Sequence, residues 1–326
     1  MHEITLTSAE AGQRLDRYLR KLLPKVPLGA IFRLLRQGDI RVDGKKVGGD
    51  LRLVEGMRVT LRVPEADIKT APAVGPENDA DEPDVLDLLP STDAMAATRR
   101  RNEAPLPPPR IVFRDDQVLV VSKPAGLAVH PGTKQEHSLT GWLAAQRVGV
   151  RTATFAPAPA HRLDRGTSGL VVIGLTPDAL RGLTAAFREG TVAKVYLAVV
   201  HGVPERAEGS ITAPLWQEPE TDPRSAKVVV DQRGQAARTD YEVVKRGRHM
   251  ALLRVVPHSG RQHQIRAHLS HIGHPILGDH RYGSIAEVGP GFCLHAGELA
   301  FPHPRTEKMV RCTDPMPREF HRLIDS

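Results

Sequence analysis

Cysteine is almost absent from this chain, with two among 326 residues. Two cysteines exclude a disulfide framework and any structural zinc site built from four cysteines. The first residues, MHEITLTSAEAGQR, are charged and lack the apolar core of a signal peptide. No apolar run approaches the roughly 18 residues that span a membrane. We therefore expect a reduced, soluble, cytoplasmic protein without a membrane segment.

Aromatic residues are also scarce, at 4% of the chain. A protein that holds single-stranded nucleic acid mainly by stacking bases on aromatic rings is therefore disfavoured. The remaining composition is ordinary for a globular protein, with 40% apolar and 25% charged residues. Lys and Arg number 45 against 38 Asp and Glu, so the net charge is +7. This excess favours a polyanionic partner without establishing one.

The positive charge is unevenly distributed along the sequence. Residues 65–109 contain eight prolines, no aromatic residue and ten acids against four bases, a local charge of −6. Such a segment buries too little apolar surface to offset its chain entropy. The flanking parts carry +13, of which +6 lies on residues 1–64. The sequence thus predicts domains over 1–64 and 110–326, joined by a flexible, acidic, Pro-rich linker over 65–109.

Two helices and a hairpin are predicted in the N-terminal domain. Apolar residues recur at helical spacing in RLDRYLRKLL, which Pro24 ends, and again from Pro27 to Gly38, a residue suited to a helix C-terminus. In IRVDGKKV, apolar and polar residues alternate around Asp43-Gly44, a signal for a two-residue hairpin turn.

The polar face of this domain is basic and carries, among other cations, Arg14, Arg33, Arg36 and Lys45. Such a face is either a solvated surface or a surface that follows RNA phosphates. The segment AGQRLDRYL…IFRLLRQGDIRVDGKKV resembles the S4 RNA-binding domain over about residues 12–64. That resemblance favours RNA.

The C-terminal domain is predicted to be rich in strands. Candidate strands are VLVVS, KVYLAVVHG, AKVVVD, ARTDYEVVKR and MALLRVVP. Helices are predicted around residues 139–145 and in RQHQIRAHLSHIG, where Ile265 and Leu269 fall on one face and are expected in the core. Many strands and few helices indicate an α+β fold with a mostly antiparallel mixed sheet.

Three segments of this domain carry residues suited to chemistry. HRLDRGTSGL places Asp164 between two arginines, which by itself is typical of a surface turn with a salt-bridged carboxylate. In KVYLAVVHG, Lys194 and Tyr196 share one face of a strand by its period of two. SGRQHQIRAHL places Arg261 and Arg266 near the start of a helix. Each segment is ambiguous when taken alone.

Their combination and order are informative. Together with KPAGLAVHPG, HPILGDHRYG and LHAGELAFPHP, they resemble the RluA-type pseudouridine synthases over most of residues 110–306. The N-terminal segments are most similar to the RluC-like group, which acts on large-subunit ribosomal RNA, with an RluD-like enzyme as the close alternative. One departure is Gly166, where an acidic or polar residue is commoner in the family. It falls in a turn, and we expect it to leave the chemistry unaffected.

The resemblance implies a reaction and three catalytic residues. Uridine becomes pseudouridine when its N1–C1′ bond breaks, the base rotates and C5 joins C1′, without a metal or an organic cofactor. Asp164 matches the family's catalytic aspartate, Arg266 the arginine that pairs with it, and Tyr196 the tyrosine that packs against the target base. Whether the carboxylate attacks the sugar or the base, or removes a sugar proton, stays open.

RNA contacts follow from the same resemblance. A uridine in folded RNA must be flipped out of its stack, and Arg162 matches a position that fills the vacated space. His161 and Arg165 are expected to support the loop or contact the RNA backbone, and we expect phosphate or loop contacts from Lys123, His130, Lys194 and Arg261.

Nine of the fifteen histidines lie between His249 and His303. The spacing of His268, His271 and His274 invites a zinc site, but no HExxH pattern or nearby cysteine pair supports one, and no metal is expected. The two cysteines, Cys293 and Cys312, are expected to be one buried residue and one surface thiol.

The predicted partner is large-subunit ribosomal RNA, bound by a monomer. Two alternatives stay open. One is a synthase that acts on transfer or messenger RNA, and the other is a non-catalytic RNA-binding factor of ribosome assembly.

Overall fold

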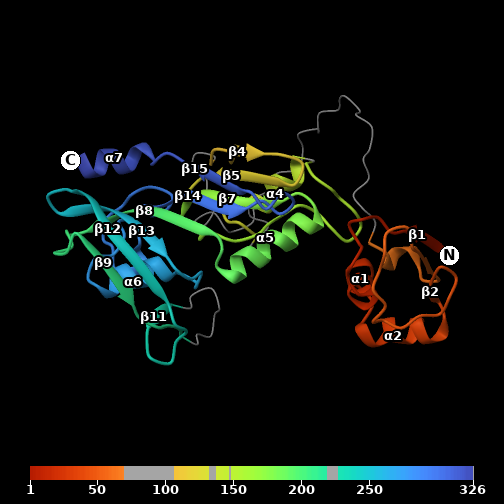
Figure 1. Cartoon of the computed structure of the whole chain (residues 1–326). Coiled ribbons are helices and arrows are strands. Elements are labelled where there is room, and N and C mark those ends of the chain that lie inside the picture. The colour runs from red at the N-terminus through yellow and green to blue at the C-terminus, as the bar shows by residue number, and fades with distance from the viewer. Residues whose placement is uncertain (70–105, 132–136, 147, 219–226, 326) are drawn as a thin grey trace, which may run out of the picture. The chain divides into compact units, whose positions relative to one another are not determined.

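A computed structural model describes residues 1–69, 106–131, 137–146, 148–218 and 227–325. The chain divides into two compact units, Met1–Pro107 with Thr152–Thr154, and Pro108–Arg151 with Phe155–Ser326 (Figure 1). Most of the predicted linker, residues 70–105, lies outside the described residues. Within the described ranges, no helix combines the length and the apolar character needed to cross a membrane.

The N-terminal unit packs two helices on a three-stranded antiparallel sheet. The helices are α1 (Leu15–Leu22) and α2 (Leu28–Gln37), and the strand order is β1 (His2–Thr5), β3 (Arg58–Leu61), β2 (Ile40–Val42). The shared core is aliphatic and includes Leu15, Leu19 and Ile31. Both predicted helices are confirmed, and Gly38 ends α2 in the left-handed conformation, with φ 83°.

The predicted hairpin is right at its turn and wrong in its second arm. Asp43 and Gly44 both have positive φ, and the residues on either side, Val42 and Lys45, exchange two backbone hydrogen bonds. The chain then leaves the sheet near Gly48-Gly49, so that β2 pairs with β3 instead. The turn residues fix the local geometry, whereas the partner of β2 is set by the packing of the whole unit.

The folded N-terminal unit also extends beyond the predicted boundary at residue 64. A 3-10 turn, η1, spans Glu65–Asp67. The Lys69 amide then donates to the carbonyl of Leu22 at the end of α1. These contacts place residues 65–69 with the folded unit rather than with the acidic segment that follows.

A large mixed sheet forms the centre of the C-terminal unit. Its strand order is β4-β5-β7-β14-β8-β13-β12-β9, with β15 beside β14 and β6 beside β7. Among the described pairs only β7 and β14 run parallel, in agreement with the predicted mostly antiparallel sheet. The bounds are β4 Arg110–Arg114, β5 Val118–Lys123, β6 Ala158–Pro159, β7 Ser168–Gly174, β8 Ala193–His201, β9 Glu208–Thr212, β12 Arg238–Arg246, β13 Met250–Pro257, β14 Leu294–Pro302 and β15 Met309–Thr313. A separate hairpin pairs β10 (Leu215–Gln217) with β11 (Val228–Val230).

Two helices cover opposite faces of the β5–β7 part of this sheet (Figure 1). The predicted helix α4 (Leu139–Ala145) packs with one set of alternating strand residues, including Val121. Helix α5 (Pro177–Glu189) packs with the other set, including Val120. Helix α5 was not predicted, although Thr176 caps its first turn, a proline follows, and Gly190 ends it.

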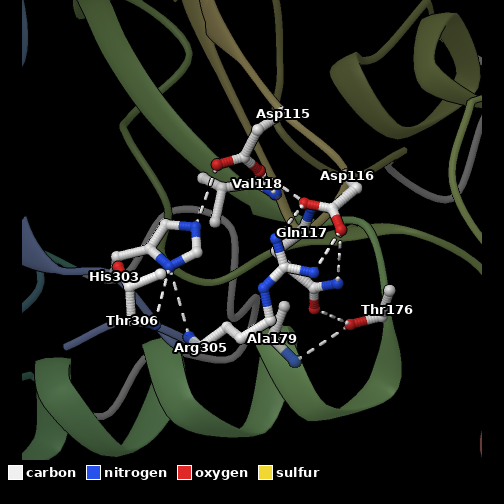
Figure 2. A network of polar contacts seen from close by, with 9 residues as sticks. All are labelled: Asp115, Asp116, Gln117, Val118, Thr176, Ala179, His303, Arg305 and Thr306. Carbon is white, nitrogen blue, oxygen red and sulfur yellow. Dashed lines mark hydrogen bonds and ion pairs between the residues drawn. The ribbon is translucent and has the colours of Figure 1, made fainter. Parts of the chain in front are cut away.

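A polar network anchors the start of α5 to two strand turns (Figure 2). The Asp115 carboxylate accepts the backbone amides of Gln117 and Val118 and a hydrogen bond of 2.9 Å from His303 Nε2. His303 Nδ1 accepts two amides of its own turn, so the ring proton lies on Nε2. Thr176 donates to the Gln117 amide oxygen while it caps α5. The network thereby fixes the helix whose far end reaches the cavity described below.

The other helices in the described part of this unit are α6 (Gln264–His271), α7 (Arg318–Asp325) and the 3-10 turn η2 (His280–Tyr282). Ile265 and Leu269 of α6 are buried in the core, as predicted. Both cysteines, Cys293 and Cys312, are buried, so the expectation of a surface thiol is wrong. Cys312 lies on the β15 face that packs with α5 and the sheet.

Candidate active site

The loop between β6 and β7 presents Asp164. A backbone hydrogen bond of 3.1 Å from the Thr167 amide to the Asp164 carbonyl closes its turn. Immediately afterwards, Gly169 has φ 109°, and a Cβ there would lie 2.3 Å from the carbonyl oxygen of Ala296. Only glycine allows β7 and β14 to approach this closely. The loop is therefore held at a fixed point of the sheet, with the Asp164 side chain 22% exposed.

A cavity of about 750 Å³ opens beside this carboxylate and contains all three predicted catalytic residues, Asp164, Tyr196 and Arg266. Its walls come from the β6–β7 loop, the end of α5, the start of β8, the end of β13 and the start of α6. Asp164 is the one acidic residue among the described residues that line it. The other lining cations are Arg162, Arg188, Lys194, Arg254 and Arg261. A cationic wall around a single carboxylate suits a polyanionic substrate.

Arg266 joins Asp164 to a second carboxylate that the sequence analysis did not single out. Its Nη1 lies 2.8 Å from Asp164 Oδ2, and its Nε and Nη2 bind Asp279 at 2.7 and 2.9 Å. Burial by itself would lower the pKa of Arg266, but its hydrogen bonds and charge pairing with the two carboxylates raise it. The bidentate pair with Asp279 orients the guanidinium, which leaves Nη1 for Asp164.

Two aromatic rings hold the same guanidinium. Its carbon lies 4.8 Å from the ring centre of Tyr282 and 4.4 Å from that of Phe292. The Phe292 ring occupies the space beside Gly166, where a Cβ would lie 2.5 Å from a ring carbon. Gly166 therefore bears on the packing of the site, a role that its position in a turn did not predict. It makes room for a ring that packs on Arg266.

Replacement of Gly166 by alanine is expected to lower the stability of the folded protein. In Gly166→Ala the new Cβ must displace Phe292, so we expect the free energy of unfolding to fall by about 1–3 kcal/mol. In the control Gly29→Ala the Cβ meets no atom within 4 Å, and because Gly29 lies in α2 we expect this change to be neutral or to stabilise by up to about 1 kcal/mol. Urea unfolding measures both variants. In a Phe292→Ala background the cost of Gly166→Ala should largely vanish, and an unchanged cost would show that the clash lies elsewhere.

Lys123 is a loop contact and not a phosphate contact. Its side chain is fully buried, and Nζ donates to the carbonyls of Pro124, Leu127 and Arg165 at 2.8–3.3 Å. Burial lowers the pKa of Lys123 to about 7, while the charge of Asp164 acts in the opposite direction. The side chain thereby links the Arg165 carbonyl, in the loop between β6 and β7, to the turn after β5.

Two residues of the predicted RNA-contacting loop are held by the protein itself. His161 Nε2 accepts the Val172 amide at 3.1 Å, and its ring stacks on Phe187 with 4.5 Å between ring centres. Burial, together with the charge of Lys194, lowers the pKa of His161 to about 3, so the ring is neutral. Arg165 donates to the Gly126 carbonyl and does not line the cavity. Both therefore support the loop, one of the two roles expected for them.

Three of the other predicted RNA contacts of this unit, Arg162, Lys194 and Arg261, line the cavity. Arg162 is exposed and has no ion pair among the described residues. Lys194 lies 3.4 Å from the Ser259 carbonyl oxygen, and burial lowers its pKa. Arg261 is exposed at the cavity rim, just before α6. His130 is exposed but is not among the cavity residues.

The predicted cations of the N-terminal unit differ in whether an ion pair within the unit already holds them. Arg14 is paired with Asp16, 2.8 Å away. Arg33 and Arg36 are exposed one turn apart on α2, and Lys45 is exposed at the hairpin turn. None of these three has an ion pair in the described part of the chain.

Of the three histidines considered for zinc, His268 and His274 make other hydrogen bonds and His271 is exposed. His268 is buried and bonded to Thr239 Oγ1 at 2.8 Å and to the Ala213 carbonyl at 3.0 Å. Across the ranges that the structure describes, no three His, Cys, Asp or Glu side chains gather as a metal site.

Four residues of the site were missed, namely His263, Asp279, Tyr282 and Phe292. The first three lie in SGRQHQIRAHL and HPILGDHRYG, segments whose order carried the family resemblance, so their motifs were a usable signal. Phe292 has no local signal, because its role depends on contacts with Gly166 and Arg266 that only the fold brings together.

Comparisons with known proteins assign the chain to a family. A family profile described as RNA pseudouridylate synthase matches residues 117–271. The chain belongs to the RluA-type pseudouridine synthase family, a class of RNA-modifying isomerases, as the sequence analysis predicted.

Particular relatives cover nearly the whole chain. It is 33% identical over 330 residues to "Ribosomal large subunit pseudouridine synthase C" of Escherichia coli (strain K12), which covers 98% of this chain and 95% of that protein. The Vibrio vulnificus (strain CMCP6) protein of the same name is 32% identical over 324 residues, with 97% and 93% covered. Among solved structures, Human RNA Pseudouridylate Synthase Domain Containing 1 superposes with a TM-score of 0.54 at 26% identity, over 64% of this chain and 83% of that one.

Proposed function

We propose that this protein converts uridine to pseudouridine in large-subunit ribosomal RNA, as an RluC-like enzyme. The observation that carries the proposal is the position of Asp164. Arg266 holds its Oδ2, while the hydrogen bonds among described residues leave Oδ1 free beside a cation-lined cavity. The names of the relatives, with coverage of nearly the full length of both chains, support large-subunit ribosomal RNA as the substrate.

The reaction places distinct demands on the cavity. The N1–C1′ bond breaks, the uracil turns, C5 bonds to C1′, the C5 proton leaves and N1 gains a proton. The Asp164 carboxylate, oriented by its hydrogen bond with Arg266, can attack carbon or accept a proton. Burial and the charge of Asp164 raise the pKa of Tyr196, so its phenol stays neutral and can pack against the base.

Entry of the uridine requires base flipping, for which we assign Arg162. It lies on the same loop as Asp164, and its guanidinium has no ion pair among the described residues. A free planar cation can fill the vacated stack and contact phosphate. The other cavity cations would hold the flanking backbone.

Release of tritium from 5-³H-uridine tests the proposal. We expect release from large-subunit ribosomal RNA and from fragments that contain its target, and little from bulk transfer RNA. Release from transfer RNA alone would favour the alternative substrate. Mapping pseudouridines in a deletion strain would then separate RluC-like modification of several sites from RluD-like modification of one hairpin loop.

The N-terminal unit is proposed to be an S4-like domain that binds RNA through α2. We expect Arg33→Ala with Arg36→Ala to weaken RNA binding and to flatten its salt dependence. Each lost phosphate contact lowers the slope of log K against log salt by about one. Filter binding across a salt series measures this slope. Arg318→Ala with Arg322→Ala removes the same charge from exposed positions on α7 and should leave it unchanged. Equal slopes for all three proteins would contradict the role of α2.

Three further features belong to the same proposal. The enzyme acts in the cytoplasm, as a monomer and without metal or organic cofactor. Activity that survives exhaustive chelation and a sedimentation coefficient of a single chain are the expected results.

A further inference from the structure

His263 occupies an unusual backbone position at the edge of the cavity. It precedes α6 with φ 52° and ψ 18°, one of three non-glycine residues with positive φ among those described. This conformation costs an ordinary residue about 1–2 kcal/mol. The side chain is 10% exposed and lines the cavity. Strain of this kind persists where surrounding contacts determine the conformation, and it recurs at functional sites.

A chain of hydrogen bonds fixes the ring of His263. The Val228 amide donates to the Tyr282 hydroxyl oxygen at 3.2 Å. That hydroxyl lies 3.0 Å from His263 Nδ1. Because the buried hydroxyl already accepts from an amide, all groups are satisfied when it donates its own proton to Nδ1. The ring proton then lies on Nε2, the nitrogen that faces Asp164 Oδ2 at 3.8 Å.

We propose that His263 is a positioning residue for Asp164, and that its Nε2–H is the second donor to Oδ2 beside Arg266. Two donors on one oxygen fix the carboxylate rotamer and leave Oδ1 as the oxygen that reacts. The gap of 3.8 Å is longer than a hydrogen bond, and it closes by about 1 Å when substrate enters, as apo catalytic contacts commonly do. This inference rests on the proposed function for its kinetic consequence and on the hydrogen-bond chain for its geometry.

The charges around the ring favour a neutral donor over a second cation. His263 faces Asp164, Asp279, Arg266, Arg281 and Tyr282. Burial lowers the pKa of His263, and the nearby arginines lower it further against the pull of the carboxylates. Since Asp279 already neutralises Arg266, the cluster of Asp164, Arg266 and Asp279 retains one negative charge. A neutral Nε2–H of His263 orients the Asp164 carboxylate without cancelling its negative charge.

Nitrogen-detected tautomer analysis of ¹⁵N-histidine-labelled full-length protein tests the geometry without any need for activity. The signal that disappears in His263→Gln identifies the residue. We expect a neutral ring protonated at Nε2 near pH 7, and loss of this fixed tautomer in Tyr282→Phe, which removes only the hydroxyl. A ring protonated at Nδ1, or a doubly protonated ring, would overturn the proposal even if the enzyme proves fully active.

Two substitutions test the consequence for turnover. His263→Asn tolerates positive φ and keeps a polar group near Tyr282, but has no donor that reaches Asp164, whereas His263→Gln places an amide N–H near the position of Nε2. Under single-turnover conditions we expect His263→Asn to slow the reaction about tenfold to a hundredfold with little change in RNA affinity. His263→Gln should stay within about fivefold of wild type, as should His271→Gln, an exposed control on α6.

A purely structural histidine would give the reverse order, because Asn fits the backbone and Gln does not. That order, or equal rates for the two variants, would refute the positioning role. A wild-type protein that forms no pseudouridine in any RNA would instead refute the proposed function, and the tautomer measurement would still decide the geometry.

Discussion

Replacement of Asp164 by asparagine is expected to abolish pseudouridine formation and to leave the affinity for RNA within a few-fold of the wild-type value. Asparagine has nearly the same shape but no negative charge, so it can neither attack carbon nor accept a proton as a carboxylate does. Removal of a group that forms the covalent or proton-transfer step costs on the order of 10⁴-fold or more in rate. Apart from Arg266, which binds Asp164, the cations that line the cavity are untouched by the change.

Single-turnover tritium release and filter binding on the same RNA measure the two quantities. Asp178→Asn, at an exposed position in the first turn of α5, is the matched control and should behave as wild type. Wild-type release that is no faster than that of Asp164→Asn would contradict the enzymatic function. The remaining explanation would then be an RNA-binding factor of ribosome assembly. Normal turnover by Asp164→Asn would move the catalytic role to another residue.

The sequence brought together the three proposed catalytic residues, which line one cavity, because each lies in a short motif whose order along the chain is specific. The period of two along a strand correctly placed Lys194 and Tyr196 at one surface, since both line the cavity. Helical spacing likewise predicted α1, α2 and α6, and a helix was also predicted where α4 lies. These features depend on local sequence, so they were accessible without the fold.

What the sequence did not yield depends on contacts between distant segments. The packing of Phe292 between Gly166 and Arg266 is an example, since none of these residues shows a local pattern that reveals the other two. A lysine is a residue type that commonly binds phosphate, yet the ammonium group of Lys123 donates to three backbone carbonyls instead. The helix α5 is a different case, because its capping residues were visible in the sequence and were not used.

Arg266 is also expected to contribute strongly to stability, because it lies between two carboxylates. In Arg266→Ala the Asp279 side chain, 2% exposed, loses both of its charged hydrogen bonds. Breaking a buried ion pair from one side costs about 3–5 kcal/mol. We expect a fall of this size in the free energy of unfolding, together with loss of turnover. Arg261→Ala, at an exposed position in the same segment, should leave stability unchanged and weaken RNA binding instead.

The pH dependence of the free energy of unfolding tests the predicted effect of Arg266→Ala in a second, independent way. An unpaired buried carboxylate has a raised pKa in the folded state, because burial disfavours its charge. A group with a raised folded-state pKa contributes its stability at low pH and loses it as the pH rises through that pKa. The stability deficit of Arg266→Ala, measured by urea unfolding, should therefore be smallest in acid and grow toward neutral pH. Adding Asp279→Asn should recover part of the stability at neutral pH and none of the turnover, since Asp164 still lacks its cation. A deficit that is independent of pH would contradict the charge-based role of Arg266 and leave only the loss of its packing between Tyr282 and Phe292.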